Sequence, residues 1–142
     1  MLKRKTILYI VLIISFIGIL LSGYLTYTHY YPESGSDVCI VGEEDSCSLV
    51  TTSSYAKIFG IPVAILGILW FLMLGFLTIT LFTSKKYVRE LFSWNVFGII
   101  FVAYFIFAEI QLKTICIMCT YVHILTVISF VLSYILWKKA KQ

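Results

Sequence analysis

Charged side chains are scarce in this chain of 142 residues, because Asp, Glu, Lys and Arg make up only 13% of it. A typical soluble domain carries about 25%. Hydrophobic residues make up 61%, more apolar surface than a soluble core of this size can hide. The composition therefore excludes an ordinary soluble domain. It predicts an all-α membrane protein, because helices satisfy every backbone amide within the hydrocarbon.

Three further features are missing from the sequence. We find no internal repeat, so a single domain over residues 1–142 is expected. No basic patch interleaved with aromatic residues accompanies the net charge of +4, so nucleic acid is not expected as a partner. The basic start and the apolar run after it resemble a signal peptide. That run is too long and lacks an A-x-A cleavage site, so we expect it to be retained as a helix.

Four apolar stretches are long enough to cross a bilayer core of about 30 Å, which needs roughly 20 helical residues. They cover residues 6–27, 62–82, 91–110 and 117–137. The sequence thus predicts a bundle of four transmembrane helices. The last three helices should pack as antiparallel neighbours, because their connections are short.

The distribution of positive charge predicts the orientation of the bundle. Lys and Arg gather at residues 3–5, in the connection 83–90 and after residue 137, which all fall on one side. By the positive-inside rule, both termini are cytoplasmic and the long loop 28–61 lies outside the cytoplasmic membrane. Glu109, near the outer end of the third stretch, is expected to extend to the surface and is assigned no catalytic role.

Two parts of the long loop differ in composition. Residues 32–46 are rich in turn-forming and acidic residues, which predicts an irregular exposed segment. Residues 50–59, VTTSSYAKIF, predict a short surface helix, with Thr52 or Ser53 as its N-cap and Gly60 as its end.

The chain has four cysteines, and the topology puts all of them at or near the outer side, where oxidising chemistry is possible. Cys39 and Cys47 lie in the loop, and Cys116 and Cys119 form a C-x-x-C pair at the start of the fourth helix. Structural disulfides, a four-thiolate metal site and a dithiol relay are the alternatives.

The relay is favoured for two reasons. A helix N-terminus stabilises thiolate, and a disulfide within C-x-x-C closes too small a loop to stabilise a fold strongly. The spacing of Cys39 and Cys47 is also looser than that of typical zinc ligands, so no metal is expected.

Several motifs together resemble the vitamin K epoxide reductase family, in particular its bacterial and archaeal members. They are the two loop cysteines, Ser53 six residues after the second, FGIPVAILG at residues 59–67, and C-I-M-C at residues 116–119. The resemblance implies a membrane oxidoreductase that passes electrons from a thioredoxin-fold (DsbA-like) protein to a quinone, such as menaquinone or ubiquinone, and supports disulfide bond formation. Many prokaryotic members carry a fused thioredoxin-like domain. None is found in this chain, so a separate partner protein is expected.

The resemblance also implies roles for individual residues. Cys39 would meet the partner, Cys47 would exchange with the C-x-x-C pair, and Cys119 would contact the quinone, whereas its position makes Cys116 the thiol within reach of the loop. Ser53 would lie near the redox centre and Phe59 in the quinone pocket. Helix capping by Ser53 and membrane anchoring by Phe59 are the alternatives.

His123 follows Cys119 by four residues and so shares its helical face. It is a candidate to hydrogen-bond or protonate the quinone, and a structural hydrogen bond to a neighbouring helix is the alternative.

Two other functions are alternatives. A quinone-coupled oxidase of the disulfide bond formation B type carries its C-x-x-C in the second helix, so the order in this chain disfavours it. A non-catalytic tetraspan protein with structural disulfides is the remaining alternative.

Overall fold

The computed structural model describes residues 3–31, 40–41, 44–45 and 50–141. These residues form four long helices, α1 (Arg4–Tyr30), α3 (Val63–Thr83), α4 (Val88–Leu112) and α5 (Ile117–Lys141). Each is long and apolar enough to cross a membrane. The predicted four-helix membrane bundle is confirmed, and the helix ends differ from the predicted bounds by no more than about one helical turn.

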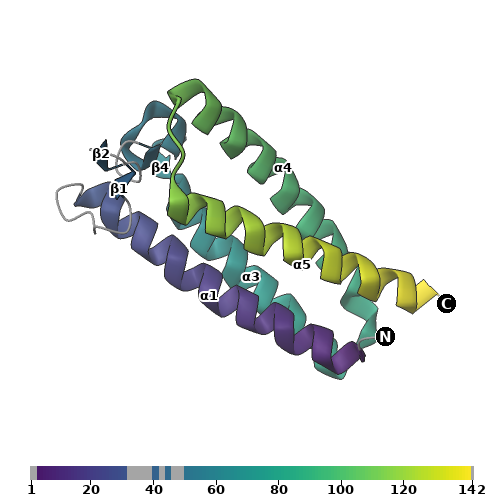
Figure 1. Cartoon of the computed structure of the whole chain (residues 1–142). Helices are drawn as coiled ribbons and strands as arrows, with labels where there is room; N and C mark the ends of the chain where they lie inside the picture. Colours follow the sequence, from purple (N-terminus) through teal and green to yellow (C-terminus); the bar gives the residue numbers. More distant parts are fainter. Residues whose placement is uncertain (1–2, 32–39, 42–43, 46–49, 142) are drawn as a thin grey trace.

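The helices run up and down along a common direction. The helix α1 packs mainly against α3 and also touches α5, whereas α4 packs mainly against α5. Figure 1 shows both termini at one end of the bundle and the short strands at the other. The short helix η4 (Lys85–Tyr87) joins α3 to α4 at the terminal end, so most of the basic residues of the sequence lie at that end, apart from Lys57 and Lys113.

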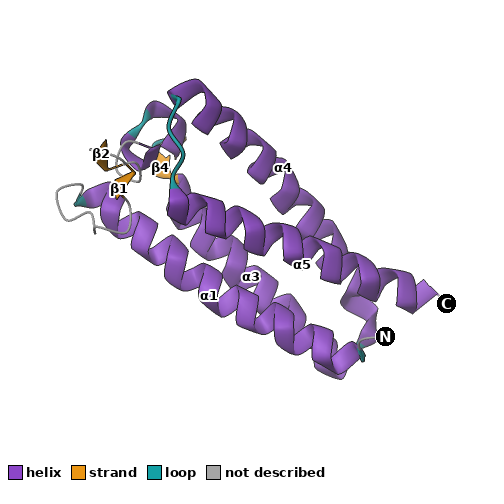
Figure 2. Cartoon of the chain, viewed as in Figure 1, coloured by secondary structure: helices purple, strands orange, loops and turns teal. Residues whose placement is uncertain are grey.

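The opposite end carries two short antiparallel strand pairs (Figure 2). The strand β1 (Ile40–Val41) pairs with β2 (Glu44–Asp45), and β3 (Lys57–Ile58) pairs with β4 (Ile61–Pro62). Residues 50–52 are helical, and η3 (Ser54–Ala56) connects them to β3.

The predicted short helix is therefore present in the first part of residues 50–59, whereas its continuation over residues 57–59 is wrong. The hydroxyl of Ser53 donates to the carbonyl of Val50 at 2.7 Å, a local bond that competes with helix continuation. Ser53 does precede η3, but its side chain makes no capping hydrogen bond. Phe59 and Gly60 have φ values of 52° and 80°, and two consecutive left-handed residues form the tight turn of a hairpin rather than a helical turn.

The half of the bundle near the termini is a packed apolar core around Phe71. An added Cβ at Gly18 would overlap the Phe71 ring, so the small residue is what allows α1 and α3 to approach closely here. The buried cluster comprises Ile7, Leu8, Val11, Ile14, Phe71, Leu74, Leu77, Leu81, Val88, Leu91, Leu132 and Leu136.

A buried polar pair joins α4 to α5 in the same half. The hydroxyl of Ser129 donates to Oδ1 of Asn95 at 2.7 Å, and Nδ2 of Asn95 donates to the carbonyl of Leu91 at 2.9 Å. Both side chains are fully buried. Because each group has a partner, the two polar residues link the helices without an unpaired atom in the apolar core.

Candidate active site

The C-x-x-C pair forms the start of α5. Cys116 immediately precedes the helix, and its Sγ accepts the backbone N–H of Cys119 at 3.2 Å. This is the geometry of an N-cap, in which a side-chain atom satisfies one of the four unpaired N–H groups of a helix start. The Cys116 sulfur therefore stabilises the helix that positions it.

The same contacts act on the ionisation of Cys116. The hydrogen bond from the Cys119 thiol, helped by the backbone N–H groups of Cys119 and Met118, holds the pKa of the Cys116 thiol below its ordinary value. Burial and the nearby carboxylate of Glu109 act in the opposite direction without outweighing these bonds. A lower pKa favours thiolate, which is the nucleophilic form in thiol–disulfide exchange.

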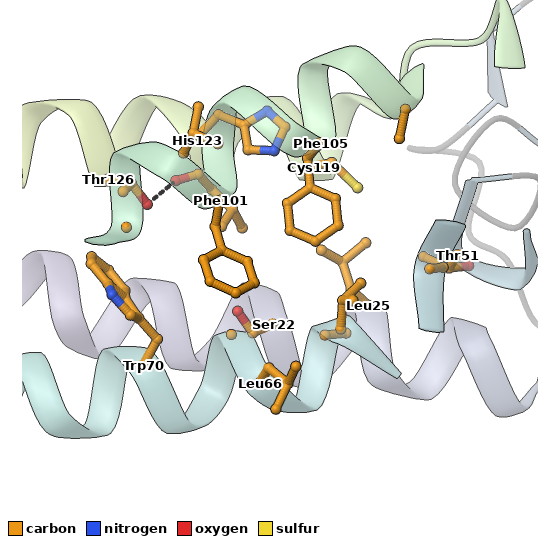
Figure 3. A pocket seen from close by; sticks show the side chains of 18 of the residues that line it. Ser22, Leu25, Thr51, Leu66, Trp70, Phe101, Phe105, Cys119, His123 and Thr126 are labelled. Carbon is orange, nitrogen blue, oxygen red and sulfur yellow. Dashed lines mark hydrogen bonds between the residues drawn. The ribbon is translucent and has the colours of Figure 1, made fainter. Parts of the chain in front are cut away.

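A cavity of about 370 Å³ lies next to Cys119 and is lined by residues of all four long helices. This volume is within the range of small-molecule sites. Figure 3 shows Cys119 and His123 on the α5 wall, with Phe101 and Phe105 projecting into the space between α5 and the helices opposite. The lining is almost wholly apolar and includes Leu25, Leu66, Trp70, Phe101, Phe105 and Val122.

Two buried polar atoms in the cavity wall have no hydrogen-bond partner among the described residues. They are Nε1 of Trp70 and Oε1 of Glu109. Buried polar groups in proteins are nearly always paired, so such atoms call for an explanation. Trp70 is a donor, and the Glu109 carboxyl group is an acceptor that also donates when it is protonated, which leaves both available to a molecule bound in the cavity.

Glu109 does not extend to the surface, so that prediction is wrong. Its side chain is only 8% exposed, and its carboxylate accepts the backbone N–H of Cys116. The reason lies in the connection after α4. Lys113 adopts a left-handed conformation with φ of 52°, which ends the helix and turns the chain so that Cys116 meets the preceding turn of α4.

The predicted site residues separate into three groups. Cys119, His123 and Ser53 all line the cavity, and the His123 ring stacks on Phe105 with centroids 6.1 Å apart. Phe59 does not join them, because it is fully exposed at the hairpin turn. Cys39 and Cys47 lie outside the described residues, so their exchange with Cys116 stays a prediction.

Trp70 and Glu109 were missed as site residues by the sequence reasoning. Trp70 lies within an apolar run that reads as a plain membrane segment, and nothing in that run distinguishes it from a packing residue. Glu109 carried a signal, since an acidic residue within a membrane segment usually has a function. Its place near the end of the stretch made surface exposure the simpler expectation.

Residues 9–134 match a known family, described as the vitamin K epoxide reductase family. The match covers all four long helices at least in part and includes both cysteines of the C-x-x-C pair. A search of curated proteins gives no match to the chain.

Proposed function

This chain belongs to the vitamin K epoxide reductase family, and from this premise we propose that it carries electrons from a thioredoxin-fold protein outside the cytoplasmic membrane to a membrane quinone. Membership of the family implies a membrane thiol–disulfide oxidoreductase that reduces quinones. The observation that supports the finer proposal most is the position of Cys119, whose side chain lines an apolar cavity directly beside the buried Cys116.

The cavity suits a quinone as the electron acceptor. A quinone head group is a flat apolar ring with two carbonyl oxygens, and the cavity offers aromatic walls with few polar atoms. Trp70 Nε1 is an unpaired donor in its wall, among the described residues, and His123 adds a ring nitrogen. Menaquinone, ubiquinone or a related quinone is the proposed acceptor, with no metal involved.

The proposed electron path runs through two disulfide exchanges. The partner's dithiol reduces a Cys39–Cys47 disulfide and itself becomes a disulfide. The Cys47 thiolate then attacks Cys116 in a Cys116–Cys119 disulfide, which releases Cys119 as a thiolate, and Cys39 attacks Cys47 to release Cys116. Each exchange passes two electrons through a mixed disulfide. The reduced Cys116–Cys119 pair then passes its two electrons to the quinone beside Cys119.

Packing around Cys116 supports the exchange with Cys47. Cys116 belongs to an apolar cluster with Leu25 and Val50. Cys47 precedes Val50 by three residues, and three residues of chain span at most about 10 Å. This short separation in sequence is compatible with the proposed exchange between Cys47 and Cys116.

The proposed orientation puts this end of the bundle outside the cytoplasm. The basic residues at the terminal end support it through the positive-inside rule. An extracytoplasmic site is also where an exported thioredoxin-fold protein would reach the loop cysteines, and where disulfides persist.

Quinone reduction by the purified protein tests this function. With a reduced thioredoxin-fold protein as donor and a soluble quinone as acceptor, we expect quinone absorbance to fall, and Cys119→Ser should abolish the reaction. Equal rates for the wild type and Cys119→Ser would instead favour the non-catalytic tetraspan protein.

The order of the cysteines has its own test. Cys39→Ser removes the thiol that resolves the mixed disulfide, so a Cys47–Cys116 disulfide should accumulate and be found by mass spectrometry of unreduced peptides. The double variant Cys39→Ser/Cys47→Ser is the control without this crosslink. A Cys39→Ser protein that never accumulates the crosslink would show that the order is wrong.

A further inference from the structure

We propose that Glu109 is a catalytic proton donor to the acceptor bound beside Cys119, and that a groove between α4 and α5 returns its proton from water. The proposal rests on the proposed function, because it concerns the same cavity and the same reaction. It adds a residue that resemblance to the family did not single out.

The first support is the environment of the Glu109 side chain. The residue lines the cavity, is only 8% exposed, and its Oε1 has no partner among the residues that the structure describes. Its carboxyl group also accepts the backbone N–H of Cys116, the residue before the helix that carries Cys119. An acidic side chain in a membrane segment is costly and usually functional. Here the unpaired oxygen belongs to the wall of the cavity next to the reactive sulfurs.

The second support is a groove that meets the cavity at Glu109. This groove, of about 690 Å³, is lined by residues of α4, α5 and the connection between them. Val102, Glu109 and His123 line both hollows, so they form the wall that separates the cavity from the groove. A carboxyl group in that wall is within reach of both sides.

The groove also contains polar groups that lead toward the outer end of the bundle. Lys113, Thr114 and Thr120 line it together with Glu109, among apolar residues such as Ile110 and Ile124. Lys113 is exposed at the end of α4. These three residues make the end of the groove nearest the surface polar, and protons can reach Glu109 from there.

The third support is the proton balance of the reaction. Reduction of a quinone to a quinol takes two electrons and two protons. Hydrogen bonding by Cys119 holds the pKa of the Cys116 thiol below its ordinary value, which favours a pair made of one thiolate and one thiol. Formation of the Cys116–Cys119 bond from that pair releases two electrons but only one proton. The second proton must come from another group.

Glu109 completes this balance. A protonated Glu109 gives one proton to a quinone oxygen, the Cys119 thiol supplies the other, and Glu109 is left as a carboxylate that regains a proton through the groove. The other titratable side chains that line the cavity, among the described residues, are Tyr55, Cys119 and His123. Glu109 differs from these three residues in combining three properties. Its carboxyl group accepts the Cys116 N–H, its Oε1 has no partner among the described residues, and its side chain lines both the cavity and the groove.

The test compares Glu109→Gln with Glu90→Gln, an exposed glutamate at the start of the same helix and the opposite end of the bundle. Glutamine keeps an acceptor for the Cys116 N–H but carries no transferable proton. We expect thiol-dependent quinone reduction to fall by about 100-fold or more in Glu109→Gln, as for loss of a general acid, and to be unchanged in Glu90→Gln. Formate or acetate should partly restore the rate of Glu109→Ala.

A readout without turnover separates proton donation from a structural role. Infrared spectra of the quinone-free protein should contain a band of a protonated carboxyl group that Glu109→Gln lacks and Glu90→Gln keeps. Quinone affinity, measured in a Cys119→Ser background, should be unaffected by Glu109→Gln. Absence of that band, equal rates for the two glutamine variants, or a loss seen in His123→Gln but not in Glu109→Gln would each overturn the proposal.

A separate variant tests the groove as the proton path, and it keeps the proposal testable if Glu109→Gln fails to fold. Ile124 lines the groove but not the cavity, so Ile124→Phe should narrow the proton path and leave the quinone site intact. We expect a several-fold slower rate with a larger effect of D₂O than in the wild type, and an unchanged rate and isotope effect would overturn the groove as the route. A wild-type protein that does not reduce quinone with thiols at all would instead refute the proposed function.

Discussion

The two ends of this helical bundle are built differently. Near the termini, twelve buried apolar side chains form one cluster, and the buried Asn95 and Ser129 bond to each other. Toward the opposite end, residues of the same helices line a cavity whose wall contains an unpaired Glu109 oxygen. Packing is concentrated at one end of the helices and reactivity at the other, and the two regions meet at Phe71, which belongs to the buried cluster and also lines the cavity. A site can therefore be hollow while the bundle is held together at its other end.

Backbone geometry follows the same division. The two non-glycine residues with positive φ among those described, Phe59 and Lys113, both lie at the end with the cavity. Each ends a regular segment, and the turn at Lys113 is what brings Cys116 to Glu109. Conformations of this kind persist where the surrounding structure holds them, and they are common near functional sites.

The largest expected effect compares one leucine from each end. Leu74 is fully buried in the apolar core, and Leu74→Ala should lower the free energy of unfolding by about 2–5 kcal/mol. Leu66 lines the cavity, where its side chain already lacks contacts on one side, so Leu66→Ala should have a clearly smaller effect. Unfolding titrations in mixed micelles measure both values.

The same two variants should rank the other way round in their effect on the KM for quinone. We expect Leu66→Ala to raise the KM for quinone, because it reshapes the cavity, and Leu74→Ala to leave KM unchanged at temperatures where the protein is folded. Equal losses of stability in the two variants would contradict the division between a packed end and a hollow end.

The second prediction concerns the buried polar pair. Asn95→Ala removes the partner of the Ser129 hydroxyl within the packed half, and should lower the free energy of unfolding by about 1–2 kcal/mol. A double-mutant cycle with Ser129→Ala measures how much of the loss belongs to the pair. Additive losses in the cycle would mean that the hydrogen bond itself contributes nothing and that the two residues act through packing alone.

The sequence predicts the bundle well, because long apolar stretches leave few alternatives to helices in a membrane. It also places Cys119 and His123 on one face, since residues four apart on a helix share a side. Glu109 and Trp70 could not be found in this way, because their roles depend on the turn at Lys113 and on the approach of α3 to α4. Contacts between segments that are distant in the sequence leave no pattern in the residues around either position.

The hairpin that replaces the last part of the expected surface helix has the same cause. Residues 50–59 have a composition typical of a short helix, and local patterns favour that interpretation. The observed path depends instead on the left-handed turn at Phe59 and Gly60 and on the hydrogen bond of His29 to the carbonyl of Thr51, 22 residues along the chain. The sequence of residues 50–59 cannot predict the contact with His29, because His29 belongs to a different segment.

The smallest expected effect is at Lys113, and it tests whether the strained turn is held by its surroundings. Lys113 has φ of 52°, a conformation that glycine adopts without strain, so Lys113→Gly should raise the free energy of unfolding by roughly 0.5–1 kcal/mol. Lys113→Ala is the matched control, because it removes the same charge from the groove but keeps the strain. The difference between these two variants therefore reports the backbone alone, and quinone reduction should proceed at the same rate in both. If Lys113→Gly were instead less stable than Lys113→Ala, a non-glycine residue would be needed at this position to restrict the backbone. The approach of Cys116 to Glu109 would then depend on that restriction.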